Sequence, residues 1–313
     1  MAASSESTAP IDNPLSPQFC ADQVGQYDVV LGYRKQLAAD TYLVRFVCPE
    51  LAARITPGQF VMVRTQRMSE ALLGRAFALY DVIRDANGNP ESIDVVFHTV
   101  GKMTNLLAEE PIESKLVIWG PLGNGFHLKP ADEDCHLIMV AGGIGQTPFL
   151  TFAKECLGKE KYGADKSKNG GRTAKQISKV SLCYGARNEK HLAGVEDFRS
   201  IGVEVHVATD DGSAGHAGFV TELLAELLEN SNDEANEIPT RIVCCGPEPM
   251  MEAVAGIAQQ SSVPCEVSLE TPMACGLGIC FSCVTKVKQS DGSWDFKRTC
   301  VDGPVFGSDK IVW

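Results

Sequence analysis

Short segments in which hydrophobic and polar residues alternate follow one another through the first third of the chain. A period of two is typical of β-strands with one buried face, and Pro57-Gly58 and Asn87-Gly88 mark tight turns. Several strands at this spacing predict a small antiparallel β-barrel over residues 25–130. One helix is expected at Gly101–Leu107, with Thr104 as its N-cap. The predicted strands are Tyr27–Leu31, Thr41–Val47, Gln59–Val63, Ala76–Val82 and Ser92–His98.

A different pattern begins at His136–Ala141, a continuous apolar run of the kind found in buried parallel strands. The run leads into the glycine-rich loop Gly142–Pro148 and then into a helical segment, Phe149–Leu157. Strand, glycine loop and helix in this order form the phosphate site of dinucleotide-binding folds. We therefore predict an α/β domain with a doubly wound parallel sheet over residues 131–262. Its further strands are expected at Val180–Gly185, Val203–Ala208 and Arg241–Pro247, and its further helices at Thr221–Leu228 and Met250–Gln259.

Composition narrows the class of protein. The chain has 313 residues, 44% hydrophobic and 22% charged, as expected for a globular protein of two or three domains. A net charge of −12 argues against nucleic acid or an anionic membrane as a partner, and no apolar run is long enough to span a bilayer. Residues 1–24 are expected to form a disordered tail. Twelve cysteines without a signal peptide indicate a reducing, cytoplasmic location.

Four of the cysteines form one pattern near the end of the chain: Cys275, Cys280, Cys283 and Cys300. The spacing C-x4-C-x2-C, then a gap of 16 residues and a fourth cysteine, matches plant-type ligation of a [2Fe-2S] cluster. Strands at Val284–Lys288 and Trp294–Arg298, joined through an Asp-Gly turn, would return the last cysteine to the others. We assign residues 263–313 to this small cluster domain. Structural zinc and disulfides are the alternatives, but zinc sites usually have paired short spacings and a reducing compartment disfavours disulfides.

These motifs together resemble the ferredoxin–NADP reductase superfamily and, within it, the electron-transfer subunits of type B dihydroorotate dehydrogenase. The resemblance extends from about residue 25 to residue 313. It is most specific at Ser268–Glu270, at the cysteine loop, and at Cys300–Phe306. Gly120–Phe126 is similar to the superfamily's loop between barrel and nucleotide domain, and Cys245–Pro247 to its motif near the nicotinamide.

The resemblance implies FAD between the barrel and the nucleotide domain, with NAD beside it. Cys245 is expected at the contact between nicotinamide and flavin as the catalytic residue. Four positions depart from the family's flavin motifs. This chain has Ala76 where the family has proline, Ala78 where it has a hydroxyl residue, His98 where it has arginine and Met103 where it has glycine. The cofactor-binding residues are expected to be Arg75, Ala76, Phe77, Ala78, Phe97, His98, Thr99, Met103, Thr104, Gly123, Asn124, Gly142, Gly143, Gly145, Gly246 and Pro247.

The resemblance also implies a partner, an FMN-containing dihydroorotate dehydrogenase catalytic subunit in a heterotetramer. Electrons would pass from that FMN through the [2Fe-2S] cluster and FAD to NAD+, in pyrimidine biosynthesis. The apolar Val305, Phe306 and Ile311–Trp313 suit either contact with this partner or packing within the cluster domain. The alternatives are a subunit of a related ferredoxin:NAD(P) or sulfide-linked oxidoreductase, and a binding module with a zinc-stapled tail. The family favours NAD, although Arg187 could meet the 2′-phosphate of NADP or be an ordinary surface residue.

Overall fold

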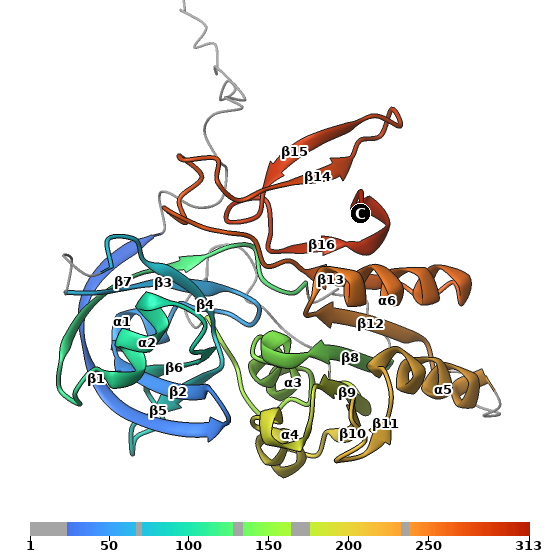
Figure 1. The fold of residues 1–313 in the computed structure, drawn as a ribbon, viewed down its shortest axis with the longest axis horizontal. Helices are drawn as coiled ribbons and strands as arrows, with labels where there is room; N and C mark the ends of the chain where they lie inside the picture. Colours follow the sequence, from blue (N-terminus) through green and yellow to red (C-terminus); the bar gives the residue numbers. More distant parts are fainter. Residues whose placement is uncertain (1–23, 67–70, 128–133, 164–175, 233–237) are drawn as a thin grey trace, which may run out of the picture.

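The computed structural model describes residues 24–66, 71–127, 134–163, 176–232 and 238–313. The predicted N-terminal tail lies outside these residues except for Val24. The described chain forms two seven-stranded sheets side by side and a two-stranded hairpin above the second sheet (Figure 1). Within these ranges, no helix combines the length and the apolar character that crossing a membrane requires.

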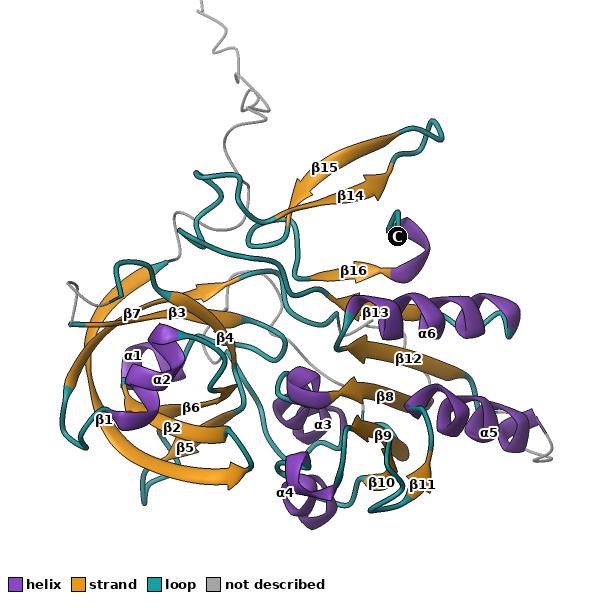
Figure 2. Cartoon of the chain, viewed as in Figure 1, coloured by secondary structure: helices purple, strands orange, loops and turns teal. Residues whose placement is uncertain are grey.

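The first sheet is antiparallel throughout, with the strand order β4-β3-β7-β1-β2-β6-β5. It curves into a half-barrel and shares an apolar core with helices α1 (Pro49–Ala52) and α2 (Lys102–Glu109), as Figure 2 shows. The predicted antiparallel barrel is therefore confirmed. Its strands are β1 (Gly25–Ala38), β2 (Thr41–Val47), β3 (Phe60–Thr65), β4 (Arg75–Ala78), β5 (Asp81–Arg84), β6 (Pro90–His98) and β7 (Lys115–Leu122).

The single strand predicted at Ala76–Val82 is wrong, because β4 and β5 are separate strands. Strand β4 pairs with β3, whereas β5 pairs with β6 at the opposite edge of the sheet. Between them Leu79 and Tyr80 are both buried, so the alternation of buried and exposed residues breaks where the chain crosses the barrel. The pattern also fails to reveal β7, whose side chains are mostly buried on both faces rather than in alternation.

The start of α2 differs from the prediction as well. Its N-cap is Gly101, and Thr104 occupies the third helical position. The Thr104 hydroxyl oxygen accepts hydrogen bonds from the backbone N–H groups of Val100 and Gly101, both at 3.1 Å. Thr104 thus caps the helix by reaching back over its first turn, in the manner of the second partner in a capping box.

The second sheet has the order β11-β10-β9-β8-β12-β13-β16 and is parallel except for its last strand. Alternate residues of β8 enter two cores: Leu137 and Met139 pack with α3 and α4, and Ile138 and Val140 pack with α5 and α6. Helices cover both faces, which confirms the predicted doubly wound sheet. The strands are β8 (His136–Gly142), β9 (Lys179–Ala186), β10 (Glu204–Thr209), β11 (His216–Ala217), β12 (Thr240–Cys245), β13 (Cys265–Ser268) and β16 (Val305–Gly307); the helices are α3 (Phe149–Cys156), α4 (Val195–Ser200), α5 (Val220–Asn232) and α6 (Glu248–Gln260).

The hairpin of β14 (Val284–Lys288) and β15 (Trp294–Arg298) has the bounds that the sequence predicts. A bridge from Val287 to Ile311 holds it over the end of the chain. Val305 and Ile311 are only 2% and 3% exposed, and Phe306 and Trp313 pack on the core under α5 and α6. These contacts favour packing within the fold over contact with a partner.

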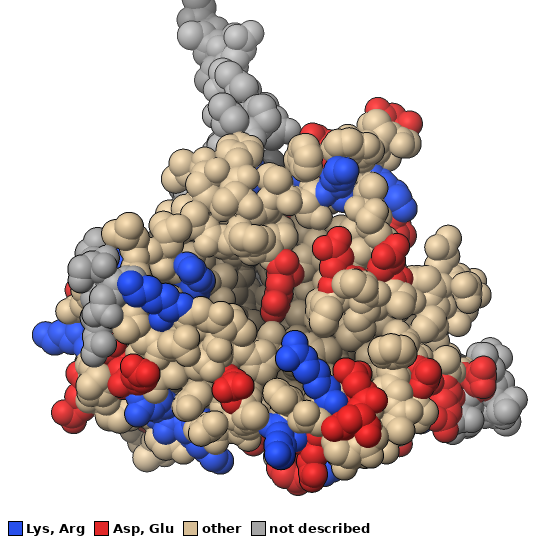
Figure 3. Space-filling model, in the orientation of Figure 1, with Lys and Arg blue, Asp and Glu red and all other residues tan. Residues whose placement is uncertain are grey.

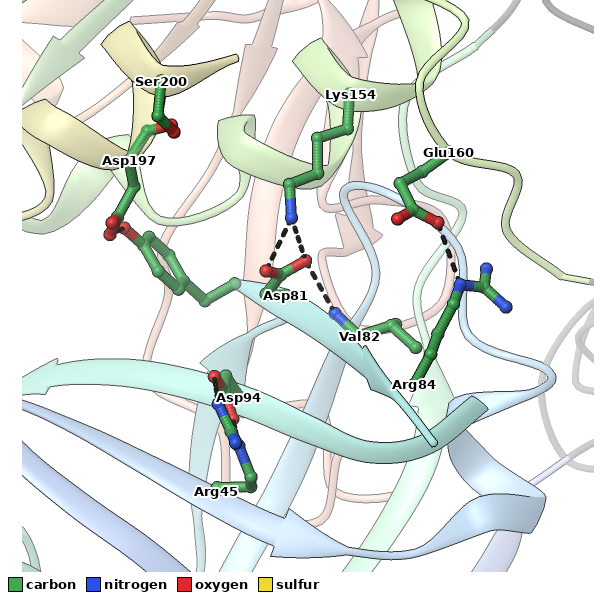
Figure 4. A network of polar contacts seen from close by, with 10 residues as sticks. Arg45, Asp81, Val82, Arg84, Asp94, Lys154, Glu160, Asp197 and Ser200 are labelled. Atoms are coloured by element: carbon green, nitrogen blue, oxygen red, sulfur yellow. Dashed lines mark hydrogen bonds and ion pairs between the residues drawn. The ribbon is translucent and has the colours of Figure 1, made fainter. Parts of the chain in front are cut away.

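The two large domains share a core. Tyr80 and Phe126 of the barrel segment pack with the residues that bury α3, and the Phe126 ring lies 4.7 Å from that of Phe152, centroid to centroid. Polar contacts surround this core (Figure 4). They are Tyr80 to Asp197 at 2.5 Å, Lys154 to both carboxylate oxygens of Asp81 at 2.7 and 2.8 Å, and Arg84 to Glu160 at 2.9 Å. This shared apolar core and the partly buried polar contacts around it fix the two domains relative to each other.

Candidate functional site

A cavity of about 430 Å³ lies between the barrel and the second sheet. Strand β4, the end of β6 and the start of α2 form its barrel side, and the carboxyl ends of β12 and β13 face them. Figure 3 shows the hollow between the two domains. Many of the predicted flavin residues line it although they lie far apart in the sequence: Arg75, Ala76, Phe77, Ala78, Phe97, His98, Met103 and Thr104, together with Cys245.

A second cavity of about 1300 Å³ adjoins the first along the carboxyl ends of the parallel strands. It lies where the strand order reverses on either side of β8, the usual ligand site of a doubly wound sheet. The predicted residues Thr99, Gly142, Gly143, Gly246 and Pro247 line it. The two cavities share a wall made of His98, Val100, Ile144, Leu269, Glu270 and Thr271.

The glycines of this region are needed because two backbones approach closely. A Cβ atom on Gly145 would lie 2.1 Å from the carbonyl oxygen of Cys245, and one on Gly246 would lie 2.9 Å from the amide nitrogen of Gly142. Gly246 also has a φ of +156°, which L side chains rarely adopt. The turns after β8 and β12 therefore pack backbone against backbone, and Gly145 serves this packing rather than lining either cavity.

Two titratable side chains line the first cavity near the carboxyl ends of β12 and β13, one that the sequence predicts and one that it does not. Cys245 is 2% exposed, and burial raises the pKa of its thiol well above the usual value, so it stays neutral near pH 7. Glu270, in the shared wall, is the unpredicted residue; its side chain is exposed to the open cavity, and desolvation by the protein groups around it raises the pKa of its carboxyl group. The signal that could have found it is the alternation of apolar and polar residues in Cys265–Leu269, which predicts a strand ending just before Glu270.

Two predicted cofactor residues, Gly123 and Asn124, make structural contacts outside the two cavities. The Asn124 amide donates to the Val305 carbonyl at 2.8 Å and accepts the Val305 N–H at 3.1 Å. A Cβ atom on Gly123, whose φ is +79°, would lie 2.5 Å from the Pro304 ring. Both residues tie the end of β7 to the segment after Cys300, and neither is among the residues that line the two cavities.

The four predicted ligand cysteines gather in two pairs. The sulfur atoms of Cys283 and Cys300 are 3.2 Å apart and buried. Cys280 is exposed, and its pKa is lowered to about 6 by Ser282 and, to a smaller extent, by the neighbouring Cys275. In the ranges that the structure describes, no three Cys, His, Asp or Glu side chains converge as a single metal ion would require. Two thiol pairs with a low-pKa member suit the thiolate ligands of a two-iron cluster.

The loop that carries three of these cysteines is shaped by its backbone. Gly276 and Gly278 have φ values of +71° and +78°. A Cβ atom on Gly276 would lie 2.7 Å from the Met62 side chain of the barrel, so the loop sits directly on β3. The Leu277 N–H donates to the Cys275 sulfur at 3.3 Å, a bond of the kind that tunes iron–sulfur potentials.

One apolar cluster connects the cysteines to the first cavity. Phe60, Ala76 and Met273 line that cavity. The same three side chains pack in one cluster with Cys283 and Cys300. The cavity therefore has the nucleotide-binding loops on one side and the buried cysteines on the other.

Comparison with known proteins identifies the family. Three family models match: the oxidoreductase FAD-binding domain at residues 28–127, the oxidoreductase NAD-binding domain at 139–256, and the iron–sulfur cluster binding domain of dihydroorotate dehydrogenase B at 270–312. The electron transfer subunit of dihydroorotate dehydrogenase B (NAD(+)) from Desulforamulus reducens is 32% identical over 88% of this chain and 94% of its own. The chain belongs to this family of electron-transfer subunits.

Other relatives agree with that assignment. The family member from Clostridium perfringens is 34% identical over 84% of this chain and 89% of its own. Among solved structures, that of an NADH-dependent reduced ferredoxin-NADP oxidoreductase, described for flavin-based electron bifurcation, matches with a TM-score of 0.68 and 26% identity over 92% of this chain and 91% of its own. A ferredoxin reductase of carbazole 1,9a-dioxygenase, at 20% identity and a TM-score of 0.58, shares the fold over 77% of this chain and 67% of its own.

Membership in the electron-transfer subunit family confirms the predicted cofactor classes. The chain is an oxidoreductase component with an FAD-binding, an NAD-binding and an iron–sulfur cluster-binding domain. The residues present fit these groups: glycines open the nucleotide cavity, apolar side chains line the flavin cavity, and thiols are paired at the cluster loop. The zinc-stapled binding module is therefore not the right description of this chain.

Proposed function

We propose that this chain passes electrons from the FMN of a dihydroorotate dehydrogenase catalytic subunit to NAD+, in pyrimidine biosynthesis. The observation that carries the proposal is the position of the flavin cavity between the nucleotide cavity and the buried cysteines. A bound flavin can exchange hydride with a nicotinamide and single electrons with an iron–sulfur cluster, so it has to lie between the two. The names of the relatives supply the substrate.

In this proposal the barrel orients FAD. Arg75–Ala78 form one wall of the cavity that would hold it, and Phe97 and Met103 line the same cavity. The Thr104 hydroxyl donates to the Gly101 carbonyl at 3.0 Å and accepts two N–H groups, so it orders the start of α2 where this helix borders the cavity. Ala78 offers no hydroxyl, so at this position only backbone groups and a methyl group are available for contact.

The second sheet would hold the nicotinamide nucleotide. Gly142 and Gly143 give its diphosphate close access to the backbone at the start of the 3₁₀ turn Gly143–Gln146. Gly246 and Pro247 border the same cavity and would place the nicotinamide toward Cys245. The buried, neutral thiol of Cys245 adds no charge at this contact and helps to exclude water from it.

The cysteine loop would bind a [2Fe-2S] cluster through Cys275, Cys280, Cys283 and Cys300. Around the exposed Cys280, Ile279 is 76% exposed and Phe281 is 54% exposed. An apolar rim around a cluster edge is a suitable surface for a catalytic partner. We place the partner there, in a cytoplasmic heterotetramer, rather than at the packed residues of β16 and the chain end.

Anaerobic co-expression with an FMN-containing dihydroorotate dehydrogenase from the same genome tests this proposal. The two chains should copurify, and the complex should reduce NAD+ with dihydroorotate. The purified chain should contain FAD and two irons per cluster and, after dithionite reduction, give the electron paramagnetic resonance signal of a [2Fe-2S] centre. A complex that forms but oxidises dihydroorotate without reducing NAD+ would refute the proposed route.

A second candidate function is a subunit of a ferredoxin:NAD(P) oxidoreductase. The observation that favours it is the solved reduced ferredoxin-NADP oxidoreductase chain, which covers nearly the whole of this one. The two candidates differ in the partner and not in the cofactors. Reduction of NAD+ by reduced ferredoxin, with no copurifying dihydroorotate dehydrogenase, would favour this second function.

A further inference from the structure

Three basic side chains gather at the mouth of the nucleotide cavity: His98 from the end of β6, Arg187 after β9, and His191 at the end of the 3₁₀ turn Glu189–His191. His98 also lines the flavin cavity, so it stands where the two cavities meet. A Cβ atom built on Gly143 would have the His98 Nε2 atom as its nearest neighbour, at 4.0 Å. This nitrogen therefore faces the glycine loop.

The hydrogen bonds of Thr41 determine which nitrogen of His98 carries the proton. The buried Thr41 hydroxyl lies 2.9 Å from the Ala39 carbonyl oxygen and 2.9 Å from the His98 Nδ1 atom. A carbonyl can only accept, so the single hydroxyl proton goes to Ala39 and the hydroxyl oxygen accepts from Nδ1–H. In neutral His98, Nε2 therefore carries a lone pair and points it toward the loop.

His191 is held in the same tautomer. Its Nδ1 atom lies 2.7 Å from the amide oxygen of Asn188, which is also an acceptor only. The Nε2 atom of neutral His191 is consequently an acceptor as well. Of the three basic residues, Arg187 alone can donate to an anion without first taking up a proton.

His98 is neutral when the cavity holds no anion. Burial lowers the pKa of its imidazole, and the nearby His191 and Arg187 lower it further, against an opposing effect of Asp40. The other charged groups on this cavity wall are Asp210, Glu248, Glu270 and Lys286. A phosphate oxygen beside Nε2 would meet a lone pair in the neutral form and an N–H donor in the protonated form.

We propose that His98, with Arg187 and His191, forms a diphosphate subsite that binds a dinucleotide together with one proton, taken up at His98 Nε2. The proton comes from solvent and returns to it when the dinucleotide leaves. Arginine at this position, which the family's pattern carries, would bind the same group without any such proton. The inference rests on the FAD- and NAD-binding domains of this chain and not on the identity of its electron donor.

FAD and NADH both carry a diphosphate group, and either could place it beside His98, because this residue borders both cavities. Two titrations separate them: FAD added to the flavin-free protein, and NADH added to the FAD-loaded protein. Each is followed by calorimetry between about pH 6 and pH 8, in two buffers that differ in ionisation enthalpy, so that protons taken up are counted directly. For one proton, Kd should weaken by up to about tenfold per pH unit between the pKa of His98 in the free protein and its higher pKa in the complex.

His98→Arg should remove the proton uptake while the dinucleotide still binds, and His98→Gln should remove it with weaker binding. His127→Gln, at an exposed histidine outside both cavities, is the matched control and should behave as wild type.

Uptake in the FAD titration alone assigns the subsite to the flavin diphosphate, and uptake in the NADH titration alone assigns it to the nicotinamide nucleotide. If neither titration takes up a proton, or if His98→Gln keeps the full pH dependence, the proposal is wrong. A protein that shows the uptake but accepts no electrons from dihydroorotate would refute the proposed function and leave this subsite intact.

Discussion

Replacing Lys154 by methionine should destabilise the protein by about 3 kcal/mol, because it leaves Asp81 buried without its counterion. The two side chains are 18% and 15% exposed, and the ammonium group contacts both carboxylate oxygens. Methionine fills a similar volume, so little of the effect comes from a cavity. In the variant, the Asp81 carboxylate would still accept the hydrogen bond from the Val82 N–H, which is 2.9 Å long in the present structure. Losing one partner of a buried pair typically costs about 3 to 5 kcal/mol, and the partial exposure places this pair at the lower end.

Equilibrium unfolding in urea, followed by tryptophan and flavin fluorescence, measures this effect. The matched variants are Asp81→Asn and the double variant Asp81→Asn/Lys154→Met. The double variant should recover most of the lost stability, because no charge is then left buried. A loss below about 1 kcal/mol in Lys154→Met, or a double variant no more stable than Lys154→Met, would refute the reasoning.

The same variant should respond to pH in a defined direction. Burial already raises the pKa of the Asp81 carboxyl group while Lys154 opposes the rise, so removing the lysine should raise it further. An acid whose pKa is higher in the folded protein favours the folded state when protonated and loses that advantage as the pH rises through its folded pKa. Lys154→Met should therefore approach wild type in stability at acid pH and differ most from it at alkaline pH.

Three further predictions concern the cavities and the cluster. Cys280→Ser should prevent assembly of a stable cluster while NADH still reduces the bound flavin; iron analysis and stopped-flow absorbance measure the two, and a full iron complement with an unchanged resonance spectrum would contradict the assigned ligand set. Gly145→Ala should destabilise the protein by about 2 kcal/mol and weaken NADH binding, because its Cβ atom would meet the Cys245 carbonyl at 2.1 Å. Its control is Gly256→Ala in α6, where a Cβ atom meets nothing within 4 Å and the fold should be unchanged or slightly stabilised. Glu270→Gln should raise the urea midpoint relative to wild type more at about pH 8 than at about pH 5, because the raised pKa of this carboxyl group disfavours its ionised form in the fold; an equal shift at both values would show that its charge is not the cause.

Segments with a clear period and a clear turn were the ones that the sequence predicted well. Thr41–Val47 and the two strands of the C-terminal hairpin have the predicted bounds, because each alternates or ends at a strong turn signal. The segment around Leu79 and Tyr80 was predicted wrongly, as part of one continuous strand. Two consecutive buried residues look like a continuing strand, but one of them, Tyr80, is buried in the core that the barrel shares with the other domain. A local pattern does not show which domain covers a side chain.

In the candidate site, too, the residues with a local sequence signal could be predicted and the others could not. The cysteine ligands could be predicted because their spacing indicates the chemistry, and the glycine loop because the strand and helix that flank it in sequence also flank it in the fold. Glu270 could not be predicted as a site residue, because it lies in the wall between two cavities that form only in the folded chain. For Gly123 and Asn124, the contacts that matter are with Pro304 and Val305, far along the chain, and no local signal indicates them.

The apolar core shared by the barrel and α3 bears on whether the two domains could be exchanged between proteins. Phe126 and Tyr80 are each about 1% exposed or less, and both depend on the neighbouring domain for their cover. A fragment ending after the barrel would expose part of both aromatic rings to water, which favours self-association over a stable monomer. The flavin half and the nucleotide half are therefore not interchangeable modules: exchanging one for its counterpart from a distant reductase would require matching these rings as well as the cofactor contacts.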